Sequence, residues 1–262
     1  MLKSRLALWK NQGKHSSYPE NILVYRDGVS EGQYQAVLTE ELPKLRQACK
    51  EIYPADQTKD GLPRMTVVIV GKRHHTRFFP TSVGDADEGT SNCIPGTVVD
   101  RGVTEARNWD FFLQAHVAIK GTARPAHYYV VHDEIFHREK KSSAPAVILP
   151  GPPKPPENAQ DTLEDITQSL CYIFGRATRA VSICTPAYYA DIVCERSRRY
   201  LRDLFDPTDG SENSSTTGGD PDPPTDGAQN PAAGEDPEVV RNREWQRRIT
   251  PHDRLKNSMF YI

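Results

Sequence analysis

A strand, helix and strand pattern over residues 21–70 constrains the fold of this chain more than any other feature. Residues 22–25 are Ile, Leu, Val and Tyr, which is typical of a short buried strand. Residues 33–52 place apolar side chains at helical spacing, so this segment should pack on a sheet. Residues 64–70 form a near-continuous apolar run, which is typical of a central strand covered on both faces. The pattern predicts an α/β fold.

Pro43 interrupts the predicted helix over residues 33–52. An interior proline costs about 3 kcal/mol unless it lies in a first turn or at a kink. We therefore expect the helix to be bent or broken near Leu42.

The remaining apolar patterns predict a mixed sheet flanked by helices. Residues 2–9 indicate a helix, residues 109–119 and 126–133 two strands of a β-meander, and residues 180–184 a further strand. Asp161 and Glu164 have the spacing of a capping box. The helix that they open should bury an apolar face made of Leu163, Ile166, Leu170, Ile173 and Phe174. Thr185 should cap a long helix that runs from Pro186 to about Phe205.

The composition indicates one sizeable core and an intracellular protein. The chain has 262 residues, of which 37% are hydrophobic, and no apolar stretch approaches the roughly 20 residues that span a bilayer. The five cysteines have neither disulfide-framework nor zinc spacing, so we expect free and mostly buried thiols. These features predict a cytoplasmic location, with the nucleus as the alternative.

Charge is distributed unevenly along the chain. The formal net charge is −2, but residues 206–238 carry nine acidic side chains and no Lys or Arg. The rest of the chain has 33 basic against 26 acidic side chains, a net charge of +7. A basic folded part fits a polyanionic partner, although a solvated surface of mixed charge is the alternative. The acidic segment is rich in Gly, Pro, Ser and Thr and is expected to be disordered, and residues 138–160 are expected to be a Pro-rich linker.

Two groups of charged residues stand at predicted strand ends. Gly28 ends the first strand, so Asp27 is expected at its carboxyl end, where open α/β sheets build their sites. A plain Asp-Gly turn is the alternative. After the strand at 64–70, residues 71–77 carry Lys72, Arg73, His74, His75 and Arg77. These side chains suit a rim that binds phosphates, or else a solvated charged loop.

The last predicted helix carries two further charged residues of interest. Arg196 falls within the apolar stripe, so its guanidinium should meet either an internal carboxylate or an anionic ligand. Asp191 lies about 140° away around the helix axis and should make different contacts. An acid near a helix amino terminus needs no further explanation, so a purely structural role for Asp191 stays open.

Several strings of residues resemble the Piwi domain of eukaryotic Argonaute proteins of the fungal type. They are Tyr-Arg-Asp-Gly-Val-Ser-Glu-Gly-Gln over residues 25–33, Gly-Thr-Ala-Arg-Pro over 121–125, Pro-Ala-Tyr-Tyr-Ala-Asp over 186–191, and the carboxyl terminus over 255–262. The resemblance implies a ribonuclease-H-like fold. It also implies guide small RNA and target RNA as partners, silencing-complex proteins as further partners, and no membrane.

The resemblance implies specific site residues. Asp27 matches the second catalytic aspartate, and Asp191 matches the third ligand of a Mg²⁺ or Mn²⁺ site, where many animal and plant members have His. Asp is chemically adequate there, because hard cations prefer oxygen ligands. The expected RNA-binding residues are Lys72, Arg73, His75, Arg77, His116, Arg124, Arg176, Arg179, Ser182, Tyr188, Arg196 and Arg198.

The resemblance also implies a domain plan and a limit on activity. Residues 1–205 would be the C-terminal portion of a Piwi domain, residues 206–250 an acidic insert, and residues 251–262 a tip that packs back on the domain. The family's first catalytic Asp and its catalytic Glu lie before the matched segment. We therefore expect negligible cleavage by the chain alone. Three hypotheses follow: part of a guide-dependent endoribonuclease, a non-cleaving RNA-binding module, or a remnant with an incomplete sheet.

Overall fold

The computed structural model describes residues 1–58, 61–136 and 158–200, together with residues 243, 252, 254, 255 and 258. The chain divides into two compact units, Met1–Ala190 and Asp191–Ile262. Most of the predicted Pro-rich linker, the acidic insert and the C-terminal tip lies outside the described residues. Within the described part, no helix is long and apolar enough to cross a membrane.

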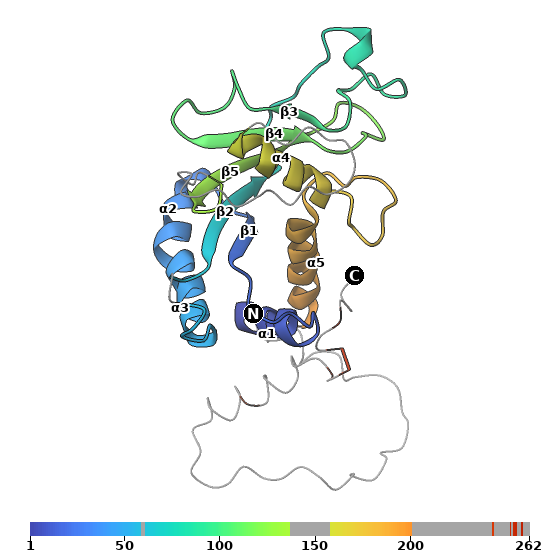
Figure 1. Cartoon of the computed structure of the whole chain (residues 1–262). Helices are drawn as coiled ribbons and strands as arrows, with labels where there is room; N and C mark the ends of the chain where they lie inside the picture. Colours follow the sequence, from blue (N-terminus) through green and yellow to red (C-terminus); the bar gives the residue numbers. More distant parts are fainter. Residues whose placement is uncertain are drawn as a thin grey trace, which may run out of the picture. The chain divides into compact units, whose positions relative to one another are not determined.

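The first unit is built on a mixed five-stranded sheet (Figure 1). Its strands are β1 (Asn21–Asp27), β2 (Arg64–Gly71), β3 (Thr97–Val99), β4 (Trp109–Gln114) and β5 (Ala126–Asp133), in the spatial order β1-β2-β5-β4-β3. Strands β1 and β2 are parallel, and the β2–β5, β5–β4 and β4–β3 pairs are antiparallel. The predicted strand-helix-strand unit and the β-meander are both confirmed.

The helices are α1 (Leu2–Asn11), α2 (Tyr34–Ala36), α3 (Leu42–Ile52), α4 (Ala159–Leu170) and α5 (Thr185–Tyr200). Two short 3₁₀ turns are η1 (Glu31–Gln33) and η3 (Val83–Asp85). The predicted break near Leu42 is confirmed, because a π-helical turn, η2 (Val37–Glu41), separates α2 from α3 and places Pro43 in the first turn of α3. A proline there loses no helical hydrogen bond.

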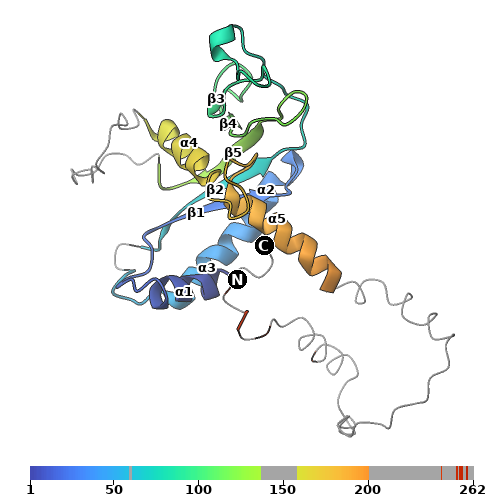
Figure 2. The same ribbon diagram turned by 90° about the vertical axis from the view of Figure 1, so that its right-hand side faces the viewer.

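Alternate residues of β2 enter two cores on opposite faces of the sheet. Met65, Val67 and Ile69 pack in a core with residues of α1 and α3, whereas Val68 and Val70 pack in a core with residues of α4 and the first turn of α5. Figures 1 and 2 show α3 and α4 on opposite sides of the strands. This alternation explains the continuous apolar run, because every side chain of a central strand is covered.

Several predicted strand features are wrong in detail. The strand predicted over residues 109–119 ends at Gln114. Residues 180–184 form no strand, because their backbone groups bond elsewhere: the Val181 N–H donates to the Cys171 carbonyl and the Cys184 N–H to the Tyr128 hydroxyl. Residues 22–25 are only partly buried, since β1 lies at the end of the sheet.

The start and the buried face of α4 also differ from prediction. Asn158 caps this helix, and its side chain accepts the Asp161 N–H at 2.9 Å. The buried face consists of Leu163, Glu164 and Thr167, while Ile166 and Ile173 are exposed. The apolar spacing misled the prediction because a threonine and a glutamate occupy core-facing positions.

The predicted cap of α5 is absent, but the cysteine prediction holds. The Thr185 hydroxyl is buried with no hydrogen-bond partner in the described part of the chain. All five cysteines are free, and four of them are buried, as predicted.

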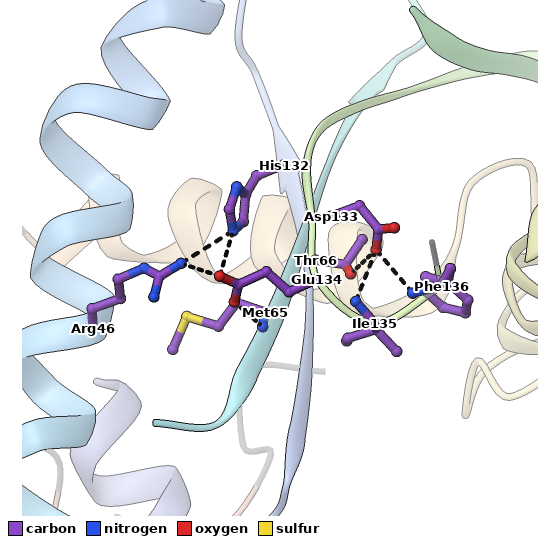
Figure 3. A network of polar contacts seen from close by, with 8 residues as sticks. All are labelled: Arg46, Met65, Thr66, His132, Asp133, Glu134, Ile135 and Phe136. Carbon is purple, nitrogen blue, oxygen red and sulfur yellow. Dashed lines mark hydrogen bonds and ion pairs between the residues drawn. The ribbon is translucent and has the colours of Figure 1, made fainter. Parts of the chain in front are cut away.

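A polar network ties α3 to the end of β5 (Figure 3). Arg46 of α3 donates to the carboxylate of Glu134, and Nε2 of His132 lies 3.3 Å from Arg46 Nη2 and 3.5 Å from Glu134 Oε1. The other oxygen of Glu134 accepts the backbone N–H of Met65 at 3.0 Å. Burial alone would raise the pKa of Glu134, but the Met65 N–H and the guanidinium outweigh it and lower the pKa.

Candidate nucleic-acid interface

The sheet topology gathers four predicted site residues, Asp27, Lys72, His116 and Arg124, at one edge. Asp27 at the end of β1 pairs in register with Val70 near the end of β2. Strand β5 begins at this edge, since Gly71 pairs with His127, and β4 ends there, since Leu113 pairs with Ala126. Lys72 lies in the segment that follows β2, His116 in the segment that follows β4, and Arg124 just before β5. All three leave the sheet at the same edge as Asp27.

Lys72 is the centre of a compact basic cluster. Its ammonium group donates to the hydroxyl of Ser182, which lies in the segment before α5. Burial lowers the pKa of Lys72, and the nearby charge of Arg124 lowers it further. A desolvated ammonium beside a second cation favours the arrival of an anion. We call Lys72, His116, Arg124 and Ser182 the Lys72 cluster.

His116 is held neutral within the Lys72 cluster. Burial, followed by the charge of Lys72, lowers the pKa of His116 to about 4. Its carbonyl accepts a hydrogen bond from the side-chain amide of Gln114 at 2.6 Å, which fixes the backbone of this turn. Its Nδ1 atom is buried with no hydrogen-bond partner in the described part of the chain. The ring therefore has unused hydrogen-bonding capacity.

The segment after Lys72 is only partly drawn into this cluster. Nε2 of His74 donates to the carbonyl of Pro125 at 3.0 Å, next to Arg124 in sequence. Burial lowers the pKa of His74. Arg77 donates from Nη1 to the carbonyls of Thr76 and His74, at 2.7 and 3.2 Å, so it also supports the local backbone. Arg73 and His75 are exposed.

The other predicted RNA-binding residues of the first unit do not join the cluster by any described contact. Arg176 and Arg179 are exposed in the segment after α4. The ring of Tyr188 packs on Phe174, with centroids 4.5 Å apart, which is a core contact. His127, in contrast, bonds to buried Asp110 at 2.7 Å and stacks on Phe112, so its role is structural.

Asp27 is the last residue of β1 and is positioned by its neighbours. Gly28 adopts a φ of +74°, a conformation that favours glycine, and its N–H donates to Asp27 Oδ1 at 2.6 Å. Arg26 donates from Nη1 to the Asp27 carbonyl and holds Glu41 of η2 through Nε to Oε2 at 2.9 Å and Nη2 to Oε1 at 3.0 Å. The sequence did not predict this Arg26–Glu41 pair. The one feature that pointed to it is that Arg26 directly precedes Asp27.

The residues present fit a metal ion only in part. Asp27 supplies a carboxylate, which suits a hard cation. Burial is the largest cause that raises the pKa of the nearby Cys184 thiol, and the charges of Cys171 and Asp27 raise it further. Across residues 1–58, 61–136, 158–200 and the five single positions, no group of three or more His, Cys, Asp or Glu could hold a metal ion. The described side chains therefore do not make a complete metal site.

The second unit carries the remaining candidates on the continuation of α5. Asp191, Arg196 and Arg198 are all exposed, so the predicted burial of Arg196 within an apolar stripe is wrong. Nε of Arg196 lies 3.4 Å from the Tyr200 hydroxyl, one turn further along the helix. The long side chain of an arginine can keep its charged end in water even on an apolar face.

The chain is similar to Argonaute proteins in sequence and in structure. It is 39% identical over 203 residues to protein argonaute 5 of Arabidopsis thaliana, covering 76% of this chain but only 18% of that protein. The C-terminal lobe of a budding yeast Argonaute has a TM-score of 0.62 at 29% identity, over 82% of this chain and 39% of the other. Kluyveromyces polysporus Argonaute, solved with a guide RNA, has a TM-score of 0.66 at 26% identity, over 100% of this chain and 26% of the other.

These similarities confirm the predicted fold and family. The mixed sheet flanked by helices matches the ribonuclease-H-like fold of the Argonaute structures. The chain spans less than a quarter of the length of this Arabidopsis thaliana relative. The family model of the Piwi domain matches residues 1–142, and the chain therefore belongs to the Piwi domain family.

Proposed function

We propose that this chain binds the phosphate backbone of a guide RNA at the Lys72 cluster. The observation that carries the proposal is the convergence of Lys72, His116 and Arg124 at one sheet edge, with Lys72 desolvated beside Arg124 and His116 held neutral beside Lys72. Arg124 is exposed and Lys72 is partly buried, and two neighbouring cations repel each other until an anion joins them. A phosphate oxygen also accepts hydrogen bonds from ammonium, guanidinium and imidazolium groups. The guide RNA bound to the Kluyveromyces polysporus protein supports RNA as the anion.

Binding of this kind positions an RNA without reading its sequence. Lysine and arginine neutralise phosphates irrespective of the attached bases, so affinity should depend on salt and little on base composition. The exposed Arg73, His75, Arg176 and Arg179 are proposed to add phosphate contacts around the cluster.

We infer that this chain serves small-RNA-guided silencing as part of an Argonaute. The supporting observation is family membership together with similarity to Argonaute proteins. Within that protein, Asp27 and Asp191 are proposed as ligands of Mg²⁺ or Mn²⁺, which would supply metal-assisted phosphodiester hydrolysis. Target RNA and silencing-complex proteins are the proposed partners, and the cytoplasm, with the nucleus as the alternative, is the proposed location.

A salt titration of RNA binding tests the proposal. Fluorescence anisotropy of a labelled single-stranded RNA would be recorded with the full chain over a range of salt concentrations. Arg124→Ala should weaken binding about tenfold and reduce the salt slope by about 0.7, the contribution of one phosphate contact to a single strand.

Lys50→Ala is the matched control for this titration, because Lys50 is exposed on α3 and its loss also removes one positive charge. This variant should bind like the unmodified chain. Binding without a salt slope, or an equal loss in both variants, would show that the Lys72 cluster is not the RNA site.

A further inference from the structure

His116 belongs to a cluster with two cations from neighbouring segments. The charge of Lys72, which follows β2, lowers the pKa of His116, and the charge of Arg124, which precedes β5, lowers the pKa of Lys72. The hydroxyl of Ser182 adds a neutral group through its bond to Lys72. The carbonyl of His116 is occupied by Gln114, while Nδ1 has no partner in the described residues. Within this cluster, the charge that acts on the imidazole is therefore positive.

We propose that His116 takes up one proton from solvent when an RNA phosphate enters the Lys72 cluster. This inference rests on the proposed RNA-binding function and adds a regulatory property to the same site. The proton binds the basic nitrogen of the neutral imidazole, and the resulting imidazolium donates a hydrogen bond to a phosphate oxygen. No other bond is made or broken.

The physical reason is a reversal of the local electrostatics. Without RNA, burial and the Lys72 charge make a third cation unfavourable. A phosphate brings a negative charge into contact with these groups, and an opposite charge within about 4–6 Å favours the charged form of a titratable group. If the bound imidazole regains the ordinary histidine pKa of about 6.5, affinity rises about tenfold between pH 7.5 and 5.5.

The test uses an oligouridine with a 5′-hydroxyl group, because a terminal phosphate itself titrates near pH 6. Binding to the full chain is measured at fixed ionic strength from pH 7.5 to 5.5. Isothermal titration calorimetry at pH 6.5 in two buffers of different ionisation enthalpy counts the protons taken up. The unmodified chain should show the tenfold gain and an uptake of about half a proton at this pH.

His116→Gln keeps a polar side chain but cannot titrate, so it should bind with nearly the same affinity across this pH range and take up no proton. His15→Gln is the control, because His15 is exposed and lies outside the Lys72 cluster. It should behave like the unmodified chain. Circular dichroism confirms that both variants are folded.

The outcomes separate this inference from the function on which it rests. Salt-dependent binding that Arg124→Ala weakens, without proton uptake, would overturn only the role of His116. The same holds if His116→Gln retains the pH dependence, which would assign the proton to another group such as His74 or the exposed His75, which is also proposed to contact phosphate. Absence of salt-dependent binding at every pH would overturn the RNA-binding function as well.

Discussion

Glu164 is a carboxylic acid placed where its charge is unfavourable. Only 9% of its surface is exposed, and one of its carboxylate oxygens has no hydrogen-bond partner in the described residues. Burial, followed by the charge of Asp100, raises the pKa of Glu164 to about 7. The folded protein therefore binds a proton between about pH 4.5 and 7 that the unfolded chain has lost, so the free energy of unfolding falls as pH rises through this window.

Glu164→Gln should stabilise the chain above neutral pH. The amide has the same size and carries no charge, and it can donate to the neighbouring carboxylate of Asp100. We expect a gain of about 1–3 kcal/mol in the free energy of unfolding at pH 8, and almost none at pH 5. Urea unfolding at the two pH values measures this, and a variant less stable than the parent at pH 8 would contradict it.

The network of Figure 3 acts at the level of elements, since it fastens α3 to the end of β5 and the start of β2. Hydrogen bonds and ion pairs lower the pKa of Glu134, so their stabilisation is complete above the unfolded pKa of about 4.5 and is lost as pH falls through the lower folded value. Both ends of the Arg46–Glu134 pair are about one-third exposed, which keeps its contribution modest.

Glu134→Gln should lower the free energy of unfolding by about 1–2 kcal/mol at pH 7, with the difference shrinking below pH 4. Glu51→Gln is the matched control, because Glu51 pairs with Lys3 at a more exposed site on the same helix. Its effect should stay below about 0.5 kcal/mol. Equal effects of both substitutions would mean that the network is no stronger than a surface ion pair.

The sequence predicted correctly those elements whose own residues show the pattern, such as an apolar run or a proline. The residues of β2 are covered on both faces, so the strand was visible as a continuous apolar run. The interruption of the helix near Leu42 was visible because Pro43 stands within the helical pattern. The predicted strand over residues 180–184 was wrong because β-propensity does not reveal whether a partner strand is available. The predicted start of α4 at Asp161 was wrong because Asn158, three residues earlier, caps the helix.

The candidate site was predictable to a different extent. A basic run at a strand end pointed to Lys72, whereas resemblance pointed to His116 and Arg124. The fold brings these residues and Ser182 together from four separate segments. The neutral state of His116 depends on burial and on a charge 44 positions earlier in the chain, and the sequence shows neither. The Arg26–Glu41 support of Asp27 depends on the same kind of tertiary contact.

For the whole molecule, we predict RNA binding without cleavage. The first unit has a core on each face of its sheet, so it should unfold cooperatively rather than aggregate as a remnant would. Among its described residues, no group of three or more His, Cys, Asp or Glu, with or without Asp27, could hold a metal ion. Incubation of the purified chain with a guide and a matched RNA in Mg²⁺ or Mn²⁺ should therefore yield no product above background on a denaturing gel. Metal-dependent cleavage that disappears in Asp27→Ala would contradict this.

Strand β1 stands at one end of the strand order and pairs, among the described residues, only with β2. In the part of the chain that the structure describes, no strand pairs with its outer side, which suits strand complementation, in which an extended segment adds to a sheet edge. Such a segment would run alongside β1 to its carboxyl end, where Asp27 lies. The polypeptide that extends the sheet there would also bring its own side chains to the carboxylate.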